Sequence, residues 1–259
     1  TFTDSGNTGH TVSENGQAQR ETEQEFKFAD DGVGYYFDGS GDYLSSADHA
    51  DWQLGGGSGN FTIDFWYRPT NGSENSFFGQ RADDNNRWMF WFDSGASAGA
   101  TFRVVDSSSE TILVKQGTNS GWSANTWYHV ALIRGWSGNA NDWVITRNGV
   151  VVATLTDSSS VPNLAAVLWI GDTTNQIAMK GYMDEIRISN TARWTTDFSG
   201  SLPTEQYNSD SNTKLLIHCG ETKSGTTGSG ATFTDSGNTG HTVTENGNAI
   251  EATGNFYKF

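Results

Sequence analysis

The sequence is short of cysteine, proline and basic side chains, and each shortage excludes a class of protein. One cysteine excludes an intramolecular disulfide framework, and 3 prolines with 13% aromatics fit neither a collagen-like nor a disordered chain. Lysine and arginine number 15 against 30 aspartates and glutamates, a formal charge of −15. Such a surface repels phosphate backbones, so we expect no nucleic-acid partner. The apolar runs are too short to span a bilayer, so we expect no membrane insertion.

The two ends of the chain repeat each other. Residues 1–18 and 232–249 are identical at 16 of 18 positions, with a constant offset of 231. This identity predicts one repeat unit over 1–231, followed at 232–259 by the start of the next unit or by an assembly strand that repeats residues 1–28. Two duplicated strands within a single domain are the alternative.

Between residues 30 and 220 the hydrophobic pattern has period two, which is typical of β-strands. The segment 127–133 is a continuous apolar and aromatic run, as expected for a strand covered on both faces. Asn148-Gly149 is a strong hairpin signal, since both residues accept positive φ. Further strands are expected at 34–38, 42–46, 61–66, 87–92, 101–105, 111–115, 167–170, 181–189 and 214–219. The pattern predicts an all-β chain with almost no helix, built as an antiparallel two-sheet sandwich.

The order of six short motifs narrows this prediction. They lie at 37–44, 59–66, 125–131, 148–149, 169–171 and 181–189. Their series resembles the laminin G-like, concanavalin A-like jelly-roll family of lectins and glucanases. Within it, the sequence is most similar to the versions in bacterial, phage and marine-virus surface repeat proteins. The resemblance covers about residues 30–200 and implies a jelly roll.

The resemblance also bears on assembly, because family members open with an apolar strand placed before a segment like TFTDSGNTGHTV. Here such a strand occurs only at 215–219, ahead of the second copy. Either the chain's own 215–259 segment folds back to supply it, or a neighbouring unit does. An unfilled sheet edge recruits strands, so we expect copies of the chain as partners. The assembly residues predicted are Thr1, Phe2, Val12, Leu215, Leu216, Ile217, Phe233 and Val243.

Several aspartates lie where members of this family often hold calcium. Asp38 and Asp42 bound a Gly-Ser-Gly turn, and Asp184 begins the closing strand. Short acidic side chains and turn carbonyls supply the hard oxygen ligands that Ca²⁺ requires. The resemblance therefore implies a calcium site at these three residues, while the alternative is that they are ordinary turn and edge residues.

Enzymatic activity is not expected. Glucanases share this sandwich, and retaining glycosidases need two carboxylates about 5 Å apart. The strand around Asp64 carries a single carboxylate. Asp184 and Glu185 are adjacent, so alternation places them on opposite faces of their strand. We therefore predict no catalytic residues.

Aromatic residues beside polar loops indicate a ligand site. Sugar rings offer an apolar face to an indole, while asparagine, aspartate and arginine bond their hydroxyls. Trp88 and Trp91 lie just after a polar loop, and Trp136 stands between glycine-rich segments. These three are the predicted ligand-binding residues, although large aromatics also dominate sandwich cores.

Two functions follow from the sequence. The repeat favours a non-enzymatic extracellular module that assembles into a fibre or tandem array by strand donation between units. The alternative is a calcium-assisted glycan-binding module of an adhesin or phage tail protein, with cell-surface or environmental glycans as partners. Both place the chain outside the cell or on a virion surface, and this fragment shows no signal peptide.

Overall fold

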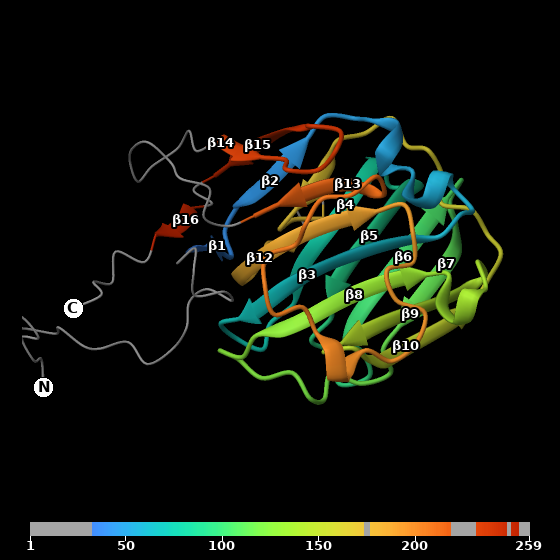
Figure 1. The fold of residues 1–259 in the computed structure, drawn as a ribbon, viewed down its shortest axis with the longest axis horizontal. Coiled ribbons are helices and arrows are strands. Elements are labelled where there is room, and N and C mark those ends of the chain that lie inside the picture. Colours follow the sequence, from blue (N-terminus) through green and yellow to red (C-terminus); the bar gives the residue numbers. More distant parts are fainter. Residues whose placement is uncertain (1–32, 174–176, 219–231, 248–249, 254–259) are drawn as a thin grey trace, which may run out of the picture.

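The protein is an antiparallel β-sandwich of two eight-stranded sheets (Figure 1). The computed structural model describes residues 33–173, 177–218, 232–247 and 250–253. Between the strands lie four single-turn 3₁₀ helices, η1 (Ala50–Trp52), η2 (Leu54–Gly56), η3 (Trp136–Gly138) and η4 (Ser199–Ser201). The predicted all-β jelly-roll sandwich is confirmed.

Sheet A faces the viewer in Figure 1. Its order is β10 (Val150–Thr156), β9 (Asp142–Arg147), β8 (Tyr128–Arg134), β3 (Phe61–Pro69), β12 (Lys180–Ser189), β1 (Val33–Asp38) and β16 (Ile250–Thr253). The last strand, β13 (Thr213–Ile217), pairs with the C-terminal half of β12, while β1 pairs with the N-terminal half.

Sheet B lies behind sheet A in that view. Its order is β14 (Thr232–Thr234), β15 (Thr242–Asn246), β2 (Tyr43–Ser46), β11 (Leu168–Ile170), β4 (Asn75–Asp83), β5 (Asn86–Phe92), β6 (Ala100–Asp106) and β7 (Ser109–Lys115). The chain crosses between the sheets repeatedly, so residues far apart in sequence meet at the sandwich ends.

Aromatic rings fill the space between the sheets. The Phe65 ring lies 4.9 Å from that of Phe77 and 6.0 Å from that of Phe90, so strands of both sheets meet there. The Asn148-Gly149 hairpin forms as predicted between β9 and β10, with φ of 50° and 77°. The strand β4 was not predicted, because its segment NSFFGQRAD mixes apolar and polar residues without a period of two.

The repeated C-terminal segment completes both sheets of its own chain. Strands β14 and β15 extend sheet B at β2, and β16 extends sheet A at β1, as the red strands beside the blue ones show in Figure 1. Of the two sources left open by the sequence, the chain's own segment therefore supplies these strands here. The side chains of Leu215, Ile217, Phe233 and Val243 lie in the main core, whereas Leu216 packs on the outer face of sheet A. The predicted assembly residues Thr1, Phe2 and Val12 lie outside the described residues.

The segment 190–212 covers the outer face of sheet A. It crosses β8, β3 and β12 in Figure 1, and Phe198 and Tyr207 anchor it in two small apolar clusters against that sheet. Within the part of the chain that the structure describes, no helix has the length and apolar character needed to cross a membrane.

Candidate functional site

The three predicted ligand-binding tryptophans lie in different places. Trp88 is fully buried in the core, and its Nε1 donates to Gln80 Oε1 at 3.2 Å. No ligand can stack on that ring, which corrects the prediction for Trp88. Trp91 is half-buried on β5, and Trp136 is half-buried against the apolar cluster that contains Phe198. The polar loops beside these residues did not distinguish core from surface, because alternate side chains of a strand face opposite ways.

The three predicted calcium ligands do not gather into one site. Asp42 is buried, and its Oδ2 accepts the Asp38 backbone N–H at 2.9 Å. Asp38 Oδ1 accepts the Ser40 N–H, which closes the turn between β1 and β2. Asp184 is buried in β12, where its Oδ1 accepts the Glu185 N–H. The trio thus forms no shared ligand set among the described residues. Calcium binding by any of these residues stays a prediction.

A cleft with a volume of about 250 Å³ opens at one end of the sandwich. Its walls are the ends of β3 and β5 together with two loops, 70–74 and 116–127. The lining residues combine aromatic rings with amide and hydroxyl groups, and they include Tyr67, Phe92, Trp122, Asn71, Asn119 and Ser123. We call this the Tyr67–Trp122 cleft. Apolar walls with a few placed polar groups are typical of small-molecule sites, and this volume suits a single ring.

Tyr67 brings a buried hydroxyl to this cleft. Its side chain is 1% exposed, and its Oη has no hydrogen-bond partner among the described protein atoms. Burial, and after it the neighbouring Tyr128, raises the pKa of Tyr67 well above its usual value, so the hydroxyl stays protonated and can donate. A buried hydroxyl without a partner costs about 1–3 kcal/mol. Because the Oη is itself buried, a ligand in the cleft does not reach it unless a side chain moves.

The indole of Trp122 is held in place from several sides. Its Nε1 donates to Gln116 Oε1 at 3.0 Å, and the Gln116 side chain is itself buried. The Arg147 guanidinium lies 5.3 Å from the Trp122 ring centroid, within cation–π range. Since the ring is only half-buried, part of it faces solvent. The structure therefore presents a fixed and partly exposed aromatic surface.

Hydrogen bonds also fix the loop that carries Trp122. Arg147 Nη1 donates to the Ser120 carbonyl at 2.9 Å, and the Asn119 amide donates to the Ser94 carbonyl at 2.7 Å. The Ser123 backbone N–H donates to Tyr128 Oη at 2.7 Å. The cleft is thus preformed, which lowers the entropy cost of binding. This site was not predicted, although Trp122 lies in a Gly/Ser/Asn loop of the kind that singled out Trp136.

A second group of polar residues is buried under the covering segment. Arg187 donates to both carboxylate oxygens of Asp64, at 3.0 and 2.9 Å, and lies 3.9 Å from the Tyr207 ring centroid. His129 Nε2 lies 2.9 Å from Tyr207 Oη and 3.5 Å from Asp64 Oδ2. Burial raises the pKa of Asp64, but the Arg187 charge and the hydrogen bonds outweigh it and lower the pKa to about 2.

Glu185 joins this buried group through a β-bulge. The register shifts between Asp184 and Arg187, and Glu185 has a φ of 50°. The Tyr207 backbone N–H donates to Glu185 Oε2 at 2.6 Å, and His218 Nδ1 lies 2.8 Å from Glu185 Oε1. Strict alternation of Asp184 and Glu185 therefore does not hold, because the bulge interrupts it. These contacts attach the covering segment to sheet A. A buried ion pair of this kind has one signal in the sequence, which is a charged residue within an apolar strand, as at Asp64.

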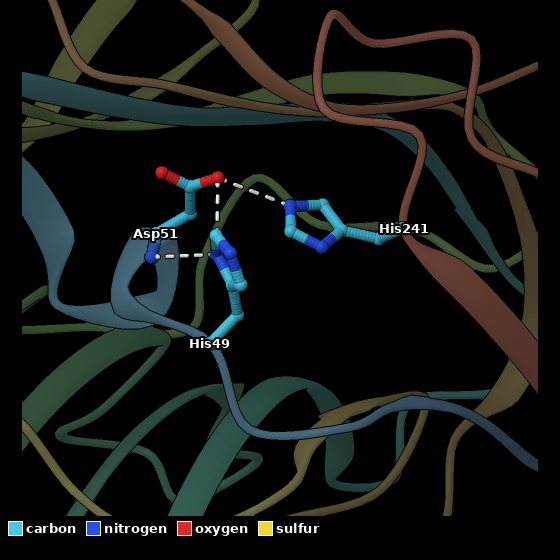
Figure 2. Close-up of side chains that lie close together, drawn as sticks. All are labelled: His49, Asp51 and His241. Atoms are coloured by element: carbon cyan, nitrogen blue, oxygen red, sulfur yellow. Dashed lines mark hydrogen bonds and ion pairs between the residues drawn. The ribbon is translucent and has the colours of Figure 1, made fainter.

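Elsewhere, three metal-ligating side chains do come together. His49, Asp51 and His241 place their ligand atoms within 4.8 Å of one another, and they form the one such group among the described residues (Figure 2). No sequence motif indicates this group, because His241 and Asp51 are 190 positions apart.

A protein-family model matches the main part of the chain. Residues 38–197, well over half of the chain, match the family model described as the Concanavalin A-like lectin/glucanases superfamily. No curated protein matches the sequence.

Solved structures add relatives of the same architecture. A putative carbohydrate binding protein from Bacteroides ovatus matches with a TM-score of 0.56 and 15% identity, over 83% of this chain and 59% of that protein. The chain thus spans little more than half of that relative's length. The mouse laminin alpha1 domains LG4-5 match with a TM-score of 0.47 and 13% identity, over 64% of this chain and 44% of that one. The CBM40 of Ruminococcus gnavus IT-sialidase matches with a TM-score of 0.48 and 12% identity, over 62% of this chain and 92% of that one.

Proposed function

The chain belongs to the Concanavalin A-like lectin/glucanases superfamily, and from that premise we propose that it is a non-enzymatic glycan-binding module acting outside the cell or on a virion surface. The observation that carries the proposal is the fixed and partly exposed Trp122 ring, which lies in a cleft lined by amide and hydroxyl groups. The B. ovatus relative, described as carbohydrate binding, supports the same class of ligand.

The cleft has the donors and acceptors that a sugar needs. The CH face of a pyranose packs against the exposed part of the Trp122 ring, and its hydroxyls reach Asn119 Oδ1. The Asn119 amide nitrogen is already used by Ser94, which leaves its carbonyl oxygen as the acceptor toward the ligand. Neutral hydroxyl and amide groups line the cleft, so a neutral sugar residue fits better than a charged one.

The burial of Asp64 and Glu185, and the bonds that their carboxylates make within the protein, support binding without catalysis. Asp64 is fully buried and bonded to Arg187 through both oxygens, and Glu185 is fully buried against Tyr207 and His218. Glycoside hydrolysis needs two carboxylates that reach the scissile bond. The lining of the Tyr67–Trp122 cleft includes no carboxylate.

A glycan array probed with the labelled full chain tests the proposal. We expect Trp122→Ala to abolish binding to the sugars that the unmodified chain selects. Tyr67→Phe should leave that binding unchanged, because the buried Oη does not face the ligand. Trp91→Ala is the matched control, because it removes a half-buried tryptophan outside the cleft lining and should leave binding unchanged. Binding lost in Trp91→Ala and kept in Trp122→Ala would refute the cleft assignment.

The repeat supports a second role, the joining of units into a tandem array or fibre. Phe233, Asp235 and Val243, the buried residues of the segment 232–246, recur as Phe2, Asp4 and Val12. Residues 1–28 therefore repeat the buried residues that complete sheet B, as strand donation to a preceding unit or to another chain requires.

Electron microscopy and light scattering of the full chain, beside a variant lacking residues 1–28, test this role. Filaments or oligomers formed by the full chain and not by the shortened one support strand donation. If both chains stay monomeric at high concentration, donation between separate chains is refuted.

A further inference from the structure

The cluster of His49, Asp51 and His241 has the spacing of a metal site. Asp51 Oδ2 lies 3.2 Å from His49 Nδ1 and 3.1 Å from His241 Nε2. Ligand atoms about 2.0–2.1 Å from a tetrahedral zinc ion are about 3.3–3.4 Å apart. A shift of a few tenths of an ångström in each pair would therefore admit the ion between the three side chains, which face one another in Figure 2.

The donor atoms at this place suit a transition-metal cation. His49 Nδ1 accepts the Asp51 backbone N–H at 3.2 Å and lies 3.2 Å from Asp51 Oδ2. A metal ion would take the Nδ1 lone pair in place of that N–H and would join the two side chains. Two imidazoles with one carboxylate suit zinc, whereas calcium prefers oxygen ligands alone.

The surroundings hold the ligands in place. The ring of His241 lies 4.3 Å from that of buried Trp52, and its backbone N–H donates to Asp235 Oδ2 at 2.8 Å. Lys214 Nζ lies 3.7 Å from the other Asp51 oxygen, Oδ1, and thus leaves Oδ2 for the ion. The His49 side chain is 48% exposed, so the fourth position of the ion opens to water.

We infer that His49, Asp51 and His241 form a zinc site that clamps the repeated segment onto the sandwich. His49 and Asp51 lie at the start of η1 in the body of the domain, whereas His241 belongs to the segment 232–246 that completes sheet B. The ion would add a bond between elements that strand pairing, side-chain hydrogen bonds and the core contacts of Phe233 and Val243 already join. His10 is the equivalent residue of the first copy, so residues 1–28 carry the same ligand.

Zinc titration of the full chain, stripped of metal beforehand, tests the inference. We expect one Zn²⁺ per chain in calorimetry, a rise in the thermal midpoint at saturating zinc, and strong tetrahedral absorption bands when Co²⁺ replaces it. His241→Ala should lose all three signals. His10→Ala is the matched control, because residues 8–12 and 239–243 both read TGHTV, and it should keep them.

Asp51→Asn is a second variant that distinguishes loss of a zinc ligand from a folding defect in His241→Ala. It preserves the size of the side chain, so we expect unchanged tryptophan fluorescence together with loss of saturable zinc binding. The inference is wrong if the unmodified chain does not bind zinc saturably, or if His241→Ala and Asp51→Asn bind it as the unmodified chain does. Stabilisation by calcium and not by zinc would overturn it as well, and would instead support the predicted calcium site.

Discussion

Replacing Asp64 by asparagine should strongly destabilise this protein at neutral pH. The Arg187 side chain is 8% exposed, and both of its bonds to Asp64 lie within the buried group under the covering segment. Removing one partner of a buried ion pair costs about 3–5 kcal/mol, because the remaining charge stays buried without compensation. That loss is a large fraction of the ~5–15 kcal/mol that stabilises a typical domain. Urea unfolding followed by tryptophan fluorescence measures it directly.

The pH dependence of this cost follows from the pKa of Asp64. The pKa falls from its ordinary 3.8 to about 2 on folding. A group whose pKa is lowered in the folded state stabilises it above the unfolded pKa and loses that contribution as the pH falls toward the folded pKa. The difference between the two values corresponds to about 2 kcal/mol. The gap in unfolding free energy between the unmodified chain and Asp64→Asn should therefore narrow by that amount between pH 5 and pH 2.

A double variant separates the charge from the packing. Asp64→Leu with Arg187→Met replaces the pair by apolar side chains and should recover most of the lost stability. The reasoning is refuted if Asp64→Asn costs less than about 1 kcal/mol at pH 7, or if its gap to the unmodified chain stays constant as the pH falls.

Two further substitutions test the cleft loop and the repeated segment. Gly121→Ala should weaken glycan binding and lower the thermal midpoint, because Gly121 has a φ of 83° and an added Cβ would overlap the Arg147 guanidinium that holds the loop. Array binding and a melting curve check this, and unchanged values for both would contradict the role given to the loop. Phe233→Ala should cost about 3–5 kcal/mol, because its ring lies in the core with 3% exposure. Phe2→Ala, the same change in the other copy, should cost the isolated chain much less. Equal losses of unfolding free energy in the two variants, measured by urea unfolding, would contradict the different roles given to the two copies.

The strands were predictable because their signals are local. The period of two in residues 61–66 and the Asn148-Gly149 turn need no knowledge of distant residues, and both formed as expected. Residues 190–196 form no helical turn, and a single 3₁₀ turn appears instead at η4. There the apolar contacts of Phe198 and Tyr207 with sheet A decide the backbone path, and local propensity cannot include them.

The candidate sites were less predictable than the strands. Neighbours in sequence do not show which face of a strand or loop a tryptophan occupies. The selection of Trp88, Trp91 and Trp136 therefore could not separate core from surface rings. Trp122 has the same kind of neighbours, and only the contacts of its loop with Gln116 and Arg147 show that it lines a cleft.

By itself, the sequence determined the all-β sandwich, the family and the near-identity of residues 1–18 and 232–249, because alternation, turn chemistry and the repeated letters are all present along the chain. Only the tertiary structure decided that the C-terminal copy completes its own unit, that Tyr67 and Trp122 share a cleft, and that His241 meets Asp51. Those three results depend on which strands become neighbours across the two sheets. That choice is made by burial of the whole core, and no single segment of the chain contains it.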